Sequence, residues 1–147
     1  MNSEAPTRQP VEILLVEDNP VDVLVTEEAL QGQDEIFRLT VVQDGKDALD
    51  YLYRRGEYGN APRPNLILLD LNIPKKDGRE ILEEIKGEPL LWDIPVIVLT
   101  TSESEADIAK SYRLHANCFV TKPAHFDEYL RVVRSIVSFW LFTAKLP

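Results

Sequence analysis

The sequence predicts an α/β protein with a doubly wound, five-stranded parallel sheet of order 2-1-3-4-5 and five helices. Five short apolar runs occur along the chain. In most of them apolar residues follow one another without alternating polar residues, as expected of strands covered on both faces. Segments with helical character separate these runs, so strand and helix alternate. Right-handed crossovers restrict the topology, and the order 2-1-3-4-5 places ligands at the carboxyl ends of the strands.

The strands are expected at the apolar runs and the helices between them. Predicted strands span residues 11–17, 38–42, 66–71, 95–100 and 118–121. Predicted helices span residues 20–31, 45–53, 78–86, 105–114 and 126 to about 142. Residues 54–65, which contain several glycines and prolines, form the one long loop of this plan.

The expected helix starts carry capping signals. Asn19 precedes a proline at the first helical position, and Asp44 precedes a glycine. Asp77 with Glu80, and Ser102 with Glu105, have the spacing of a capping box.

Length and composition indicate one domain. The chain has 147 residues, of which 44% are hydrophobic and 28% charged, an ordinary balance for a soluble globular protein. We expect residues 1–10 to form a flexible tail, and residues 11–147 to form a single domain with an extended C-terminal helix and tail. No output domain is expected after the last helix, so signalling would proceed through binding.

Charge and cysteine content weigh against several functions. The formal net charge is −9, so the molecule should be repelled by nucleic acid and by anionic membranes. No apolar run resembles a signal peptide or is long enough to cross a membrane. The one cysteine, Cys118, cannot form an internal disulfide, which favours a cytoplasmic location.

Polar residues end four of the five strands. Glu17-Asp18 follow the first strand and Asp70 follows the third, and these strands are neighbours in the predicted order. Converging carboxylates repel one another unless a cation compensates, and an all-oxygen site with open positions suits Mg²⁺. Thr100 and Lys122 end the fourth and fifth strands, where a hydroxyl and an ammonium group could bind phosphoryl oxygens. The bond from Lys122 to the following proline is a candidate for the cis form.

This pattern resembles the receiver domains of bacterial two-component response regulators, which have a flavodoxin-like fold, over about residues 11–139. The matching motifs are Glu17-Asp18, Leu69-Asp70-Leu71-Asn72-Ile73-Pro74, Asp77-Gly78, Thr100 and Lys122-Pro123. The resemblance implies that Asp70 accepts a phosphoryl group from a sensor histidine kinase. It also implies that Asp18, Asp70 and the backbone carbonyl of Asn72 hold Mg²⁺, that Glu17 does so through water, and that Lys122 and Thr100 bind the phosphoryl group.

The resemblance further implies a switch. Phe119, three residues before Lys122, stands at the family's switch aromatic, where many members carry tyrosine. Thr100 would move toward the phosphoryl group, and Phe119 would turn inward and change the surface of the fourth helix, fifth strand and fifth helix. Alternatively, Phe119 is an ordinary core residue. Asn72 and Ser102 would flank the water that hydrolyses the acyl phosphate. Only Mg²⁺-dependent self-phosphorylation and autodephosphorylation are expected, so the protein is not classed as an enzyme.

The last helix suggests a homodimer. At 100° per residue, one apolar stripe should face the sheet, namely Phe126, Tyr129, Leu130, Val133, Ile136, Val137, Trp140 and Leu141. Phe139, Phe142 and Leu146 fall on the opposite side and would form the dimer contact, unless the tail folds back over its own domain. Residues 56–65 and 138–141 resemble the small single-domain regulators paired with phytochrome-type histidine kinases.

Three other functions fit less well. A phosphatase of the haloacid dehalogenase type would need its D-x-D on the first strand, whereas Asp70 lies on the third. A flavodoxin-like electron carrier would need a hydroxyl-rich phosphate loop after the first strand, where Glu17 and Asp18 would repel phosphate. The complete acidic set argues against a pseudo-receiver that acts only as an interaction module.

Overall fold

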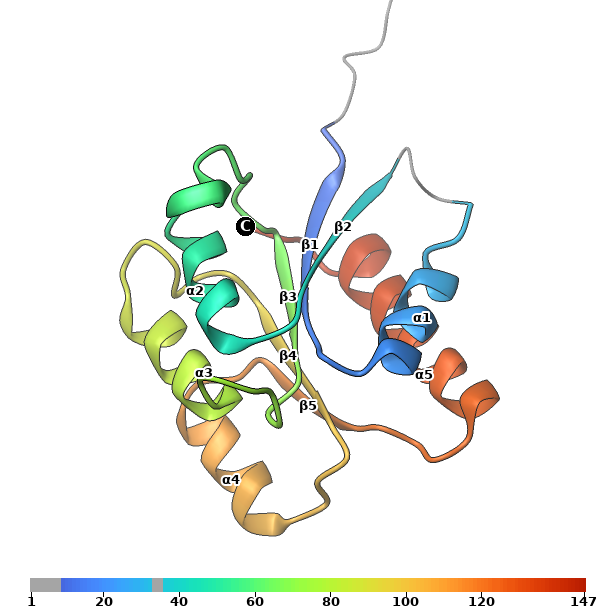
Figure 1. Ribbon diagram of the computed structural model, residues 1–147. Helices are drawn as coiled ribbons and strands as arrows, with labels where there is room; N and C mark the ends of the chain where they lie inside the picture. Colours follow the sequence, from blue (N-terminus) through green and yellow to red (C-terminus); the bar gives the residue numbers. More distant parts are fainter. Residues whose placement is uncertain (1–8, 33–35) are drawn as a thin grey trace, which may run out of the picture.

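The computed structural model describes residues 9–32 and 36–147 (Figure 1). Most of the expected flexible tail, residues 1–8, lies outside the described residues. Five parallel strands form one sheet of order β2-β1-β3-β4-β5, which confirms the predicted topology.

Every predicted strand and helix is present, with ends that shift by a few residues. The strands are β1 (Val11–Val16), β2 (Phe37–Val42), β3 (Leu66–Leu69), β4 (Val96–Thr100) and β5 (Cys118–Thr121). The helices are α1 (Pro20–Ala29), α2 (Gly45–Leu52), α3 (Gly78–Gly87), α4 (Glu105–Arg113) and α5 (Phe126–Ser138). The long loop contains a short 3-10 helix, η1 (Gly56–Tyr58), and α5 continues into one π-helical turn, η2 (Phe139–Thr143).

Helices cover both faces of the sheet. Helices α1 and α5 lie on one face, and α2, α3 and α4 lie on the other (Figure 1). Successive residues of β1 enter opposite cores: Ile13 packs in the core with α1 and α5, and Leu14 packs in the core with α2 and α3. This two-sided burial explains why the strands have continuous apolar runs rather than alternating ones.

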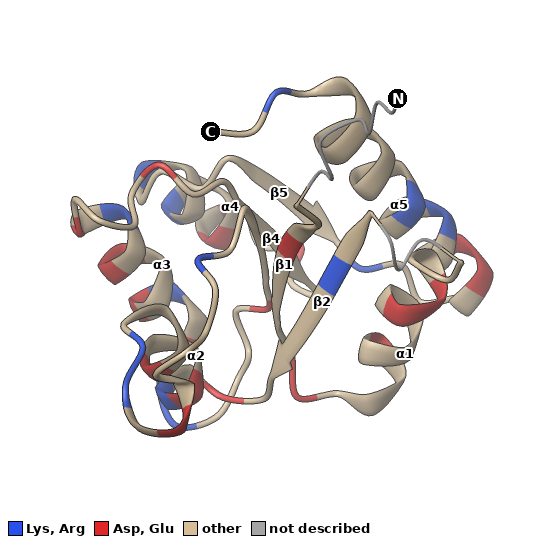
Figure 2. Cartoon of the chain, turned by 90° about the horizontal axis from the view of Figure 1, so that it is seen from above, with Lys and Arg blue, Asp and Glu red and all other residues tan. Residues whose placement is uncertain are grey.

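Charged residues are almost absent from the strands themselves. Figure 2 shows one acidic residue on β1 and one basic residue on β2, which are Glu12 and Arg38, joined by an ion pair of 3.2 Å. Strands β3, β4 and β5 carry no charged residue. Charged residues near these three strands therefore follow the strands rather than lie within them.

Side-chain caps fix the starts of most helices. Asn19 Oδ1 accepts a hydrogen bond from the Val21 amide at 2.9 Å, and Asp44 and Asp77 cap α2 and α3 in the same manner. The expected cap of α4 by Ser102 is wrong. Ser104 caps α4 instead, because its hydroxyl oxygen accepts a hydrogen bond from the Asp107 amide at 3.3 Å.

The C-terminal segment corrects two sequence expectations. Phe126, expected to face the sheet, is 43% exposed because it begins α5 beyond the apolar core. Leu146, expected on the outer side with exposed Phe139 and Phe142, is half-buried. Phe142 also stacks edge-to-face on Phe37 at the start of β2, with ring centroids 5.7 Å apart, so the tail does fold back in part over its own domain.

Two further features concern the whole described chain. Residues 9–32 and 36–147 contain no cis peptide bond, so the expectation of a cis bond after Lys122 is wrong. None of the helices in these ranges combines the length and apolarity that crossing a membrane requires.

Candidate functional site

The site lies where β1 and β3 end. Val16 pairs with Leu69 in the parallel register, so the residues that follow, Glu17 and Asp70, leave the sheet at the same level. Glu17 and Asp70 are both buried, at 2% and 6% exposed, whereas Asp18 is exposed. Carboxylate oxygens of Glu17, Asp18 and Asp70 lie within 4.8 Å of one another. We call these three residues the acidic cluster.

Lys122 joins the acidic cluster from the end of β5. Its Nζ donates to Glu17 Oε2 at 2.6 Å, to Asp70 Oδ2 at 2.9 Å and to Asp22 Oδ2 at 2.7 Å. Asp22 lies in the first turn of α1 and was not expected in the site. The ammonium group is 4% exposed, so these charge-assisted bonds form away from water, where they are strongest.

Four carboxylates and one ammonium meet at this site, so one positive charge does not compensate all of the carboxylates if they are ionised. Burial raises the pKa of Glu17 above its ordinary value, the hydrogen bond from Lys122 opposes that rise in part, and the charge of Asp70 adds to it. Burial lowers the pKa of Lys122, but its hydrogen bonds to Asp22, Glu17 and Asp70 outweigh burial and leave it raised. Lys122 therefore stays charged, while the cluster retains an excess of negative charge.

This excess, and the chemistry of the donors, fit a divalent cation. Every donor in the acidic cluster is a carboxylate oxygen, the ligand type that Mg²⁺ and Mn²⁺ accept. Two of the three carboxylates are buried and the third faces solvent, which leaves a side open for water ligands. The residues present thus suit a hard divalent ion with an incomplete protein shell.

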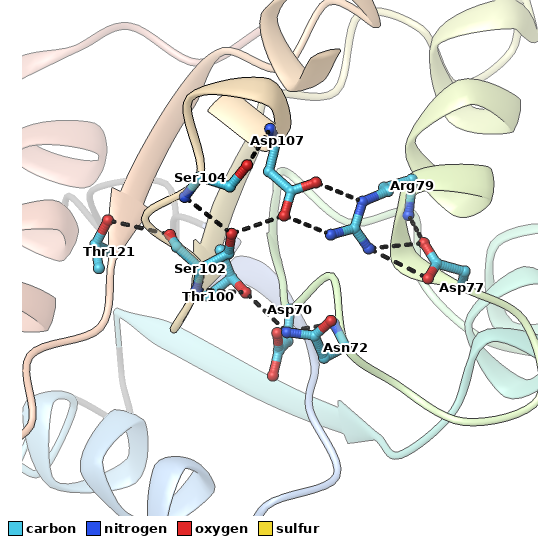
Figure 3. Close-up of polar contacts among 9 residues, drawn as sticks. All are labelled: Asp70, Asn72, Asp77, Arg79, Thr100, Ser102, Ser104, Asp107 and Thr121. Carbon is cyan, nitrogen blue, oxygen red and sulfur yellow. Dashed lines mark hydrogen bonds and ion pairs between the residues drawn. The ribbon is translucent and has the colours of Figure 1, made fainter. Parts of the chain in front are cut away.

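A second set of polar contacts connects Asp70 to the end of β4 (Figure 3). The Asn72 amide donates to Asp70 Oδ1 at 3.0 Å, and the Asn72 side-chain nitrogen donates to Thr100 Oγ1 at 3.3 Å. Thr100 is fully buried, and its hydroxyl oxygen also accepts from the Ser102 amide at 3.5 Å. In this arrangement Thr100 is paired with Asn72 and Ser102.

The backbone after Asp70 is held closely against the start of α3. Gly78 donates its amide to the Leu71 carbonyl at 3.0 Å. A Cβ atom at Gly78 would lie 2.5 Å from the Asp70 carbonyl oxygen and 2.6 Å from Leu71 Cα, so only glycine fits without displacing this backbone. Within the same loop Lys75 has a φ of 69°.

The structure does not bring every predicted residue to this site. Phe119 is half-buried on β5, where it packs against the core of α2 and α3 and donates its amide to Tyr112 Oη at 3.2 Å. Phe142 contacts Phe37, the first residue of β2, and so lies at the amino ends of the strands, whereas the acidic cluster lies at the carboxyl ends of β1 and β3. The expected dimer contact is thus remote from the acidic cluster.

Comparison with known proteins gives concordant results. The family model described as "Response regulator receiver domain" matches residues 13–134. The response regulator Rcp1 of Synechocystis sp. (strain ATCC 27184 / PCC 6803 / Kazusa) is 51% identical to this chain over 138 residues, which cover 94% of each protein.

Solved structures agree with the sequence match. The Mn²⁺-bound form of response regulator Rcp1 has a TM-score of 0.91 at 51% identity, and the alignment covers 94% of this chain and 99% of that one. The phosphorylated cyanobacterial phytochrome response regulator RcpA has a TM-score of 0.92 at 51% identity, with 95% and 99% covered.

Proposed function

The chain belongs to the response regulator receiver family, and on that premise we propose that Asp70 is its phosphoacceptor. One observation carries the assignment: Asp70 is a buried carboxylate at the end of β3, and its Oδ2 lies 2.9 Å from Lys122 Nζ. A buried carboxylate beside an ammonium group and two further carboxylates is arranged to receive a dianionic group once positive charge compensates it.

The reaction is a transfer of one phosphoryl group. An Asp70 carboxylate oxygen forms a bond to phosphorus while the bond from phosphorus to the donor's phosphohistidine nitrogen breaks, and the departing imidazole takes a proton from solvent. Lys122 stabilises the negative charge on the phosphoryl oxygens, and the Thr100 hydroxyl donates to one of them. Hydrolysis later reverses the modification, as water attacks phosphorus and the Asp70 carboxylate departs with release of phosphate.

The site would hold Mg²⁺ through Asp18, Asp70 and the Asn72 carbonyl, and through Glu17 by way of a water molecule. Rcp1, at 51% identity, has been solved in an Mn²⁺-bound form, and the donor set of this chain has the same hard-cation chemistry. When bound, the cation neutralises charge that Lys122 alone leaves uncompensated.

The donor is proposed to be a sensor histidine kinase of the phytochrome type, because RcpA is described as a phytochrome response regulator and is 51% identical to this chain. We propose a cytoplasmic location for this exchange, which the lone cysteine favours. The partner-binding surface would be α4, β5 and α5. Phe119 on β5 would adjust this surface when Thr100 moves toward the phosphoryl group.

A homodimer through the C-terminal segment is proposed on the exposure of two aromatic residues. Phe139 and Phe142 are 52% and 58% exposed in η2, the turn that continues α5, and two exposed aromatic side chains in one turn suggest a contact surface. Leu146 would contribute less, since it is half-buried.

The phosphoacceptor assignment is tested by incubation with acetyl phosphate and Mg²⁺, followed by intact mass spectrometry. We expect one phosphoryl adduct on the wild-type protein, stable in acid and labile in base, and none on Asp70→Asn. Asp93→Asn is the matched control, because Asp93 is an exposed acid that pairs with Arg63 away from the site. An adduct that persists in Asp70→Asn, or no adduct on the wild type, would refute the assignment.

A further inference from the structure

An ion pair joins α3 to α4 beside the proposed phosphorylation site (Figure 3). Arg79 Nε donates to Asp107 Oδ1 at 3.0 Å and Arg79 NH2 donates to Asp107 Oδ2 at 2.8 Å, a two-pronged contact. Both side chains are mostly buried, at 22% and 23% exposed. Asp77, the cap of α3, accepts two further bonds from Arg79 NH1 at 3.2 Å and so fixes the direction of the guanidinium.

This ion pair connects to Thr100 through one side chain. The Ser102 hydroxyl donates to Asp107 Oδ2 at 2.7 Å, and the Ser102 amide donates to Thr100 Oγ1 at 3.5 Å. The Ser102 carbonyl accepts from Thr121 Oγ1 at 3.4 Å. Ser102 is thus bonded at its amide, carbonyl and hydroxyl, and the shortest of these bonds goes from the hydroxyl to the Asp107 carboxylate, which Arg79 holds.

We propose that Arg79 and Asp107 are positioning residues that hold residues 101–104 in the arrangement observed, and thereby oppose movement of Thr100 toward a phosphoryl group on Asp70. This inference rests on the proposed function. Thr100 Oγ1 accepts hydrogen bonds from Asn72 and from the Ser102 amide, so a movement that brings its hydroxyl within donating distance of a phosphoryl oxygen draws this oxygen away from those two donors. Ser102 must shift with it, which strains or breaks the bond to Asp107.

The two helices differ in a way that makes such a tether effective. Helix α3 is anchored to the core by Ile81, Leu82 and Ile85, all fully buried. Helix α4 buries only Ser111 among its residues 105–113. An element with little buried apolar surface moves at low cost, so the contact with the anchored helix supplies much of what fixes it.

The hydrogen bond that caps α4 does not involve Ser102. The Ser104 hydroxyl oxygen accepts it from the Asp107 amide, whereas the Ser102 hydroxyl donates to the Asp107 carboxylate. The Ser104 amide also donates to Ser102 Oγ at 3.3 Å. Ser102→Ala therefore removes the link between Thr100 and the ion pair, together with this exposed contact to the Ser104 amide, and leaves the Ser104–Asp107 cap and the Arg79–Asp107 contact in place. This variant separates positioning from a simple role in helix stability.

The test is a titration of the full chain with beryllofluoride, a tetrahedral phosphoryl analogue, in saturating Mg²⁺. We expect Asp107→Asn, Arg79→Gln and Ser102→Ala each to bind beryllofluoride about two- to tenfold more tightly than wild type, the usual size of such couplings. The double variant Ser102→Ala/Asp107→Asn should bind no more tightly than the stronger of its two single variants, since all act through one tether. Mg²⁺ affinity, measured without beryllofluoride, should stay within about twofold of wild type in each variant.

Arg63→Gln is the matched control, because it breaks another arginine–aspartate pair, with Asp93 at 2.6 Å, remote from Thr100. Equal or weaker beryllofluoride binding by Ser102→Ala overturns the inference, as does tighter binding by Arg63→Gln. If Arg79→Gln does not fold, the result for Ser102→Ala decides the test, because this variant loses only one hydroxyl group and should still fold. If the wild-type protein binds no beryllofluoride in Mg²⁺, the proposed function itself is refuted. If the wild type binds beryllofluoride and the variants bind it equally well, only this inference is refuted.

Discussion

Lys122 Nζ lies 2.9 Å from Asp70 Oδ2, and this contact joins the last strand of the sheet to its centre. The same ammonium lies 2.6 Å from Glu17 and 2.7 Å from Asp22. One positive charge thus serves three carboxylates. A bound divalent cation would share two of these carboxylates, Glu17 and Asp70, with Lys122.

Removal of Lys122 should therefore strengthen divalent cation binding. We expect Lys122→Met to bind Mg²⁺ about tenfold more tightly, because a nearby competing charge is lost, an effect of about 1.4 kcal/mol. The metal-free variant should unfold more easily, since buried carboxylates lose their partner. Calorimetric titration at fixed ionic strength measures the affinity, with Lys46→Met, an exposed lysine paired to Asp50, as the control. Weaker Mg²⁺ binding in Lys122→Met would contradict the charge balance described above.

The Arg79–Asp107 pair should make the free energy of unfolding depend on pH in the acid range. Hydrogen bonds from Arg79 and Ser102 lower the pKa of Asp107 below its ordinary value of 3.8. A lowered carboxyl pKa stabilises the folded protein above the unfolded pKa, and that contribution is lost as the pH falls through the folded pKa. Asp107→Asn should cost about 1–2 kcal/mol at pH 7, and this difference should shrink below about pH 4.

Urea unfolding of wild type and Asp107→Asn between pH 3 and 7 checks this expectation. The quantity of interest is the difference between the two free energies of unfolding at each pH. A difference that stays constant down to pH 3 would argue against an ionised, hydrogen-bonded Asp107.

Lys75 adopts a left-handed conformation, with a φ of 69°, in the loop after Asp70. Its exposed side chain also pairs through Nζ with Oδ2 of the buried Asp44 at 3.3 Å. Lys75→Gly and Lys75→Ala both lose this pair, but only glycine relieves the backbone. We expect Lys75→Gly to be more stable than Lys75→Ala by about 1 kcal/mol in chemical denaturation. Equal stabilities would show that the loop relaxes away from the left-handed region.

Ser111 is the buried residue of α4, at 1% exposed, and its hydroxyl has no hydrogen-bond partner among the described residues. A buried hydroxyl without a partner costs free energy, and alanine both removes it and favours a helix. Ser111→Ala should therefore raise the free energy of unfolding by about 1 kcal/mol. Ser135→Ala, at an exposed position of α5, is the comparison, because its hydroxyl bonds to the Arg131 carbonyl and alanine should have little effect there. Destabilisation by Ser111→Ala would indicate that the hydroxyl is hydrogen bonded in solution.

The residues that end strands were predictable from the sequence. Parallel strands buried on both faces have apolar runs with sharp ends, and their carboxyl ends meet at one edge of the sheet. Glu17, Asp70 and Lys122 could therefore be assigned to one site from the order of the strands alone. The structure places Lys122 Nζ 2.6 Å from Glu17 Oε2 and 2.9 Å from Asp70 Oδ2.

Contacts between helices could not be predicted in this way. Asp22 reaches Lys122 from α1, and Arg79 reaches Asp107 from α3, and neither pair has a sequence spacing that reports it. The start of α4 was ambiguous for a local reason. Ser102 with Glu105 and Ser104 with Asp107 share the same spacing. In the structure Ser104 caps the helix, and Ser102 lies before it with its hydroxyl bonded to the Asp107 carboxylate.

The contact between Lys122 and Glu17 joins residues 105 positions apart in the chain. A fragment that lacks β1 or β5 cannot assemble this pocket, and a protein still adding its last strand has an aspartate without its ammonium partner. Chemical competence therefore arrives only with completion of the fold. Incomplete or partly unfolded copies of the protein would therefore not be phosphorylated by the kinase.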